Sequence, residues 1–145
     1  MKKLILLMLA FAIAGGSYAQ KISASKVPAP VTAAFKKQFP DVKSVTWELE
    51  NGNYEANFKK SGMEMAAEFD KNGTTIETEA EIKTSELPAP ATSYVKSHYK
   101  SSIKEASKIT KANGEVNYEA VVGDSELIFD ASGKYLKESK EEKKH

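Results

Sequence analysis

The side chains in this sequence that could do chemistry are almost all carboxylates. The chain has no Cys and only two histidines, His98 and His145. Neither histidine belongs to a His-Glu-x-x-His pattern, and the sequence has no Gly-x-Ser-x-Gly element and no glycine-rich phosphate loop. A hydrolase that uses two acids needs both in one cleft with different pKa values, which a flat sheet does not provide. We therefore predict that the protein is not an enzyme and has no cofactor and no metal site.

Glutamates recur at alternating positions in the first half of the chain. A period of two places side chains on one face of a β-sheet. The residues that we predict to form a partner-binding face are Glu48, Glu50, Glu55, Glu64, Glu68, Glu77 and Glu79. Like charges directly across a sheet destabilise it by a few tenths to about 1 kcal/mol per pair. The face is therefore either simply hydrated or held ready for a cationic partner, and both interpretations stay open.

The elements that position these glutamates are strands joined by tight turns. Between Val45 and Gly73 the sequence alternates apolar and polar residues in three segments, separated by Asn51-Gly52 and Ser61-Gly62 and ending at Asn72-Gly73. This pattern is typical of antiparallel strands in chain order, and a fourth strand follows as far as Ile82. The apolar residues that alternate with the glutamates include Trp47, Leu49, Tyr54, Phe58, Met65, Phe69 and Ile76.

A predicted helix precedes these strands and supplies a second apolar surface. Prolines suit its first turn, and Pro40 ends it because the residue before a proline avoids helical geometry. Its apolar stripe consists of Val31, Ala34, Phe35 and Phe39. A helix laid across a four-stranded antiparallel sheet buries both surfaces at once. We therefore predict an α+β fold in which Trp47, Tyr54 and Tyr118 are core residues.

The same plan begins again about sixty residues later. Pro28 matches Pro88 and Phe69 matches Phe129 at an offset of 60, and the offset drifts to 64 between Tyr54 and Tyr118. We predict two tandem units, 27–82 and 87–138, each a short helix on a four-stranded antiparallel sheet. A short polar linker, residues 83–86, is expected between them.

The second unit differs from the first at several predicted positions. Ile109 is its best match to Trp47, and His98 is expected on the helix surface. Asp130, like Asp70 in the first unit, is expected to form a turn. The face that corresponds to the acidic one is less acidic, with Glu119 and Glu126 beside Val121 and Ile128.

Both ends of the chain are predicted to lie outside the folded units. Residues 1–19 combine two lysines, an apolar run and Ser17-Tyr18-Ala19, which is typical of a signal peptide cut after Ala19. The apolar run is too short for a comfortable membrane span. We predict a periplasmic or secreted protein with no membrane insertion after cleavage. Residues 20–26 are expected to be a flexible lead and residues 139–145 a disordered polar tail.

The charges argue against nucleic acid as a partner. Removal of the predicted signal peptide takes away two lysines, so the formal charge falls from +1 to −1. Every basic residue is Lys, whereas bidentate recognition of phosphates and base edges is mostly performed by Arg.

The order of short motifs resembles a family of secreted domains. The motifs are the Val45-x-Trp47 strand, Gly52-x-Tyr54-Glu55-Ala56, and Glu64 and Glu68 before Phe69, Asp70 and Gly73. In this order they resemble the beta-lactamase-inhibitor-like, PepSY-like domains of Bacteroidetes. The resemblance implies a helix plus a four-stranded antiparallel sheet, duplicated, without catalytic residues, and it suggests an inhibitor-like role by shape.

We expect a secreted binding module that engages a protein or peptide through its open sheet face. One alternative is a protein that sequesters cations or small ligands, although no Asp-x-Asp-x-Asp-Gly calcium loop is present. A second alternative is an envelope hydrolase, which the inventory of side chains disfavours.

Overall fold

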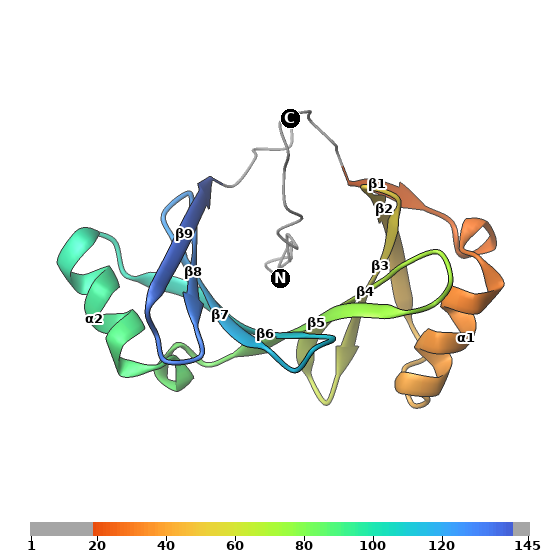
Figure 1. The fold of residues 1–145 in the computed structure, drawn as a ribbon, viewed down its shortest axis with the longest axis horizontal. Helices are drawn as coiled ribbons and strands as arrows, with labels where there is room; N and C mark the ends of the chain where they lie inside the picture. Colours follow the sequence, from red (N-terminus) through yellow and green to blue (C-terminus); the bar gives the residue numbers. More distant parts are fainter. Residues whose placement is uncertain (1–18, 141–145) are drawn as a thin grey trace. The chain divides into compact units, whose positions relative to one another are not determined.

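The computed structural model describes residues 19–140, which form an α+β fold with two α-helices and nine β-strands. The chain divides into two units, and Glu79 is the last residue of the first. The first unit contains β1 (Gln20–Ile22), the 3-10 helix η1 (Ala24–Lys26), α1 (Ala29–Gln38), β2 (Val45–Glu50), β3 (Asn53–Lys60), β4 (Met63–Phe69) and most of β5 (Thr75–Ile82). The second contains the end of β5, η2 (Thr84–Glu86), α2 (Ala89–His98), β6 (Ile103–Lys111), β7 (Val116–Val122), β8 (Ser125–Asp130) and β9 (Tyr135–Lys140) (Figure 1). Residues 1–18 of the predicted signal peptide and residues 141–145 of the predicted tail lie outside the described part.

The first unit is held together by aromatic side chains between α1 and β2–β4. The Phe35 ring lies edge-on to two rings of the sheet, with centroids 5.4 Å from Trp47 and 5.1 Å from Phe58. The Phe39 ring also packs on Phe58, at 4.5 Å. Trp47 is only 3% exposed, and each aromatic side chain of this kind buries about 150–250 Å². The prediction that Trp47 belongs to the core is confirmed, and Tyr54 packs against the same core while partly buried.

The segment predicted to be a flexible lead, residues 20–26, is ordered, so that prediction was wrong. β1 pairs with β2 in antiparallel register, with Ile22 opposite Trp47. Ile22 packs on the core of the first unit, and η1 follows. A strand of three residues is too short to show a period, but its backbone groups still pair with those of β2. The first unit therefore has one strand, β1, in addition to the predicted four-stranded set, and it lies beside β2.

Two further polar segments contain regular secondary structure that the sequence analysis did not predict. The expected linker, residues 83–86, contains η2, in which a carboxylate oxygen of Glu86 accepts a hydrogen bond from the Lys83 backbone N–H at 2.7 Å. Ser139 and Lys140, expected in a disordered tail, are the last residues of β9. Ser139 lies opposite Glu126 of β8, so backbone pairing orders this end without apolar side chains.

The boundary between the two units lies inside β5. The last residues of this strand, Ala80–Ile82, follow β1 by an offset of 60. Ile82 packs on the core of the second unit as Ile22 packs on that of the first. Each unit therefore begins with a short strand, continues through a 3-10 helix and an α-helix, and ends with antiparallel strands.

The second unit fills its core with different residues. In the first unit Trp47 lies opposite Ala56, which lies opposite Ala67. The corresponding row in the second unit is Ala106, Ala120 and Leu127. The prediction that Ile109 replaces Trp47 was wrong, because Ile109 lies opposite Asn117 on the other face of the sheet. An irregular register at the start of β6 and the drifting offset hid this change of face.

The turn before the last strand of each unit lies in close contact with the first turn of the helix. An Asp70 carboxylate oxygen accepts the backbone N–H groups of Asn72 and Thr74 at 2.8 and 2.9 Å, and Asp130 does the same in the second unit. The prediction that both aspartates form turns is confirmed. Gly73 has a φ of +84°, and a Cβ there would lie 2.4 Å from the Pro30 carbonyl oxygen.

Candidate binding face

Three glutamates stand next to each other on the face of the first sheet that points away from α1. Glu48 of β2 lies opposite Glu55 of β3, and Glu55 lies opposite Glu68 of β4. We call these three residues the glutamate row. The residues between them along the strands, such as Trp47 and Phe69, face α1 and the core. The prediction that Glu48, Glu55 and Glu68 share the face opposite the helix is confirmed.

Glu55 at the centre of the row is buried. Its side chain is 4% exposed, and its Oε1 atom has no hydrogen-bond partner among the described residues. Burial, with the neighbouring charges of Glu48, Glu50 and Glu68, raises the pKa of Glu55 to about 8, although a hydrogen bond with the Asn57 side chain acts in the opposite direction. At pH 7 the protonated form of Glu55 therefore predominates.

The other predicted glutamates of β2 to β4 lie around the row. Glu64 forms an ion pair with Lys59, with 3.1 Å between Oε1 and Nζ. Glu68 accepts a hydrogen bond at 2.8 Å from the Asn53 side chain amide. Glu50 lies opposite Asn53 at the end of the same hairpin. Alternation places Asn53 and Asn57 on this face too, so the sequence contained a signal for these two amides that the prediction did not use.

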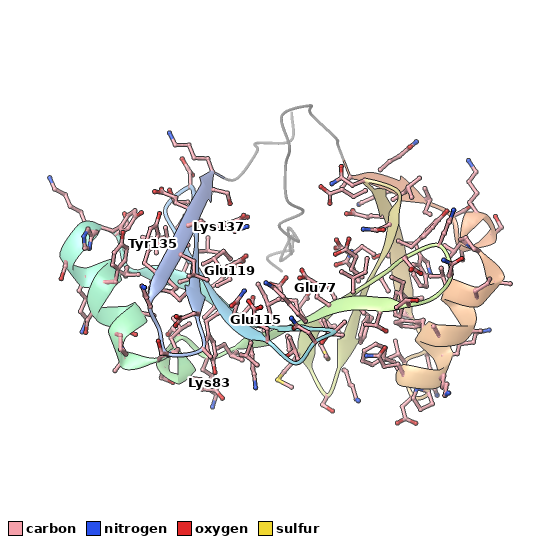
Figure 2. All side chains as sticks on the ribbon, viewed as in Figure 1. Glu77, Lys83, Glu115, Glu119, Tyr135 and Lys137 are labelled. Carbon is pink, nitrogen blue, oxygen red and sulfur yellow. The ribbon has the colours of Figure 1, made fainter. Side chains whose placement is uncertain are left out.

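The two predicted residues of β5 differ in exposure. Glu77, labelled in Figure 2, is half-buried, whereas Glu79 is 1% exposed. The prediction treated the whole face as open, and this was wrong for Glu55 and Glu79. Burial depends on the surroundings of a strand in space, and a period of two along the strand does not report it.

The corresponding face of the second unit has lost most of its acidity. The row that matches the glutamate row consists of Ser107, Glu119 and Ile128, and Lys137 of β9 lies opposite Ile128. Figure 2 shows Tyr135 on the α2 side of β9, with Glu119 and Lys137 on the other side. Glu126 is buried on this face and accepts a hydrogen bond from the Ser139 hydroxyl at 3.0 Å.

The other features considered as possible functional sites are His98, metal-binding clusters and membrane-spanning helices. His98 lies at the end of α2, where its Nδ1 is 2.9 Å from the Tyr94 carbonyl oxygen and its ring stacks on Tyr94 at 4.0 Å. Its predicted position on the helix surface is confirmed. Among residues 19–140, no group of three or more His, Cys, Asp or Glu side chains is placed to hold a metal ion. No helix within this range is both long and apolar enough to cross a membrane.

The order of the elements agrees with a known family of sequences. The family model described as "Putative beta-lactamase-inhibitor-like, PepSY-like" matches residues 17–67 and 52–137. The chain belongs to this family. The resemblance predicted from the short motifs is confirmed, and the family description names no enzyme activity. None of the curated proteins matches the chain significantly.

Solved structures from Bacteroides share the fold of this PepSY-like protein. A protein from Bacteroides eggerthii described as a putative periplasmic protein aligns with a TM-score of 0.71 and 16% identity, over 79% of this chain and 88% of its own. A DUF2874 family protein from Bacteroides ovatus has a TM-score of 0.67 and 22% identity, over 78% and 86%. A BLIP-like protein from Bacteroides fragilis has a TM-score of 0.61 and 24% identity, over 81% and 92%.

Proposed function

We propose that this PepSY-like protein is a non-enzymatic periplasmic binding module whose glutamate row receives a basic segment of a protein or peptide partner. The observation that carries the proposal is Glu55, which is 4% exposed with one carboxylate oxygen unpaired among the described residues. An unsatisfied buried polar atom costs about 1–3 kcal/mol, which a stably folded protein normally avoids unless the site has a use.

A cationic partner would relieve this cost. A Lys or Arg side chain brought to the row would donate hydrogen bonds to Glu55 and compensate the negative charges of Glu48 and Glu68. The same contact would lower the pKa of Glu55, so binding at pH 7 would release a proton. Asn53 and Asn57 supply amide groups beside the row that suit the backbone of an extended segment.

A titration of the protein with a lysine-rich peptide tests this proposal. We expect calorimetry at pH 7 to show saturable binding that weakens with salt, because the screening length falls to about 3 Å at 1 M. Repeating the titration in buffers with different ionisation enthalpies should reveal release of a fraction of one proton.

Matched variants separate the row from general acidity. Glu48→Gln/Glu68→Gln should weaken binding, whereas Asp41→Asn/Asp124→Asn, which removes the same charge from exposed positions, should not. If both variants bind the peptide equally, or if no proton is released, the row is not the binding site.

The family description and a BLIP-like structural neighbour favour an inhibitor as a more specific form of this function. An assay of a purified class A beta-lactamase with a chromogenic substrate tests it directly. Dose-dependent inhibition would support the inhibitor role, and unchanged hydrolysis at saturating protein would exclude it for that enzyme class.

Export is part of the proposal. The putative periplasmic neighbour and the signal-like sequence at residues 1–19 support it. Mass spectrometry of the protein from a periplasmic fraction should find Gln20 as the first residue, and an intact amino terminus would contradict cleavage.

A further inference from the structure

The second unit contains a groove beside its α-helix. A hollow of about 810 Å³ lies between η2, α2 and the segment 99–103 that leads into β6. Its apolar floor consists of Leu87, Val95 and Ile103. Leu87 and Val95 are buried, and Ile103 packs against the core of this unit. The volume falls within the range of pockets that hold small ligands, about 300–1,000 Å³.

The walls of the groove are unusually rich in hydroxyl groups. Six Ser and Thr side chains line it, namely Thr84, Ser85, Thr92, Ser93, Ser101 and Ser102. Lys96 and Lys100 also line it, and both are exposed. No carboxylate belongs to this lining. The groove therefore offers apolar contact, neutral hydrogen-bonding groups and positive charge together.

The path of the chain after the helix differs between the two units. Phe39, at the end of α1, has a ψ of 64°, and the chain turns back so that the Val42 N–H donates to the Phe39 carbonyl oxygen at 3.2 Å. Val42 then packs against the core. Tyr99, at the end of α2, has a ψ of 141°, so the chain leaves this helix fully extended.

Substitutions between the units follow the same division. At an offset of 60, Ala33 corresponds to Ser93 and Val42 to Ser102. Ala24, Pro40 and Asp41 likewise correspond to Thr84, Lys100 and Ser101. Each of these five changes adds a hydroxyl or a positive charge to the groove, or removes a negative charge or an apolar side chain. Other lining residues do not follow this trend, because Ser85, Thr92 and Lys96 match residues of the same type in the first unit, and Ile103 corresponds to Lys43. The core packing of an α+β unit does not need these changes, because the first unit folds the same elements without them.

The hydroxyl of Tyr99, one of the residues that line the groove, contacts a residue of β9. Desolvation and a hydrogen bond with the Glu138 carboxylate raise the pKa of Tyr99 to about 12. Glu138 is held in turn by the Ser125 hydroxyl. This contact fixes the side chain of Tyr99 against β9.

We propose that this groove binds an acidic saccharide. The apolar residues of the lining suit the C–H faces of a pyranose, the six hydroxyls suit its hydroxyl groups, and Lys96 and Lys100 suit its carboxylate. The site is formed entirely by the second unit and does not use the glutamate row.

NMR titration of the full mature protein with trigalacturonate tests this site. We expect saturable shifts in the amides of η2, α2 and residues 99–103. Lys96→Ala/Lys100→Ala should weaken binding roughly tenfold or more, because it removes the charge-assisted hydrogen bonds to the ligand carboxylate. Ser93→Ala/Ser102→Val, which restores the residues of the first unit, should also weaken it roughly tenfold.

Controls keep the result specific. Lys36→Ala, at the position in α1 that matches Lys96, and Glu48→Gln/Glu68→Gln should leave trigalacturonate binding unchanged. Amide spectra of each variant without ligand show whether it is folded. No shift with trigalacturonate at about 10 mM would overturn the proposal. Equal binding of neutral galactotriose, or equal shifts with inorganic phosphate alone, would also overturn it.

Discussion

The two units of this protein build the same elements on different interior side chains. The first packs α1 against β2–β4 with Phe35, Phe39, Trp47, Phe58 and Phe69. Among the matching positions the second keeps only Phe129 as a buried aromatic, and Val95, Ala106 and Val122 replace larger residues. Leu127, fully buried where the first unit has Ala67, recovers part of the lost volume.

In the second unit most aromatic side chains lie beside the helix, whereas in the first unit they lie between the helix and the sheet. Tyr94 stacks between His98 and Tyr135, with ring centroids 4.0 and 4.6 Å away. In the first unit the same place is bridged by a hydrogen bond of 3.0 Å from the Thr75 hydroxyl to the Gln38 side chain. Both units fill the space between helix and sheet with apolar side chains, but they use different residues to do so. Surfaces can therefore diverge, as the glutamate row and the groove do.

The largest expected effect is on the aromatic core. Trp47→Ala should lower the free energy of unfolding by about 4 kcal/mol, because it leaves a large cavity next to Phe35 and Phe69. Urea unfolding followed by circular dichroism measures the change. A loss below about 1 kcal/mol would mean that Trp47 is not the centre of this core.

The exchange of side-chain volume between positions 106 and 127 can be tested in the second unit. Ala106→Trp alone should be destabilising, because it adds a large side chain to a core that already contains the buried Leu127. Adding Leu127→Ala, which restores the pair of the first unit, should recover part of the loss in a double-mutant cycle. Simple additivity of the two changes would contradict the exchange of volume between these positions.

The next largest effect concerns the turns that the units share. Gly73→Ala should cost about 3 kcal/mol, since its φ is +84° and the new Cβ would lie 2.4 Å from the Pro30 carbonyl oxygen. Gly133→Ala should behave similarly in the second unit, where the Cβ would meet Pro88 at 2.8 Å. Gly52→Ala is the matched control, because φ is also positive there but no atom lies within 4 Å. Equal losses of melting temperature at Gly52 and Gly73 would refute the close contact.

The pH dependence of stability should distinguish the glutamate row from its counterpart. The folded-state pKa of Glu55 is about 8 and its ordinary value is 4.5, so the folded protein binds the extra proton between these values. Stability should therefore fall as pH rises through this window, by about 2 kcal/mol between pH 6 and pH 8. Glu55→Gln should remove this fall and leave stability near pH 4 unchanged. Urea unfolding at several pH values measures it, and a parallel fall in the variant would assign the effect to other groups.

The smallest expected effect lies at the flank of each helix. Tyr135→Thr should cost about 1 kcal/mol, because it removes a stacked ring from Tyr94. Thr75→Ala in the first unit should cost about 0.5–1.5 kcal/mol for the lost hydrogen bond with Gln38. Thermal unfolding of both variants measures the two changes. A Tyr135→Thr loss as large as that of Trp47→Ala would show that the stack belongs to the core.

The sequence alone was enough to predict the α+β class, the positions of the helices and the face on which each glutamate of β2 to β4 lies. These features follow from periods along the chain, such as the alternation of Trp47 with Glu48, and from prolines and glycines that act locally. The family followed from the order of short motifs, because that order reflects the sequence of elements.

Which of those residues are buried, and which lie next to each other, depends on how segments far apart in the chain pack together. Glu48, Glu55 and Glu68 form a row because the strand register aligns them. Glu55 is buried because neighbouring side chains cover it. The groove beside α2 is lined by residues of η2, of α2 and of the segment 99–103, which the fold brings together. Burial, register and cavities arise from contacts between distant segments, and a local pattern of residues does not contain those contacts.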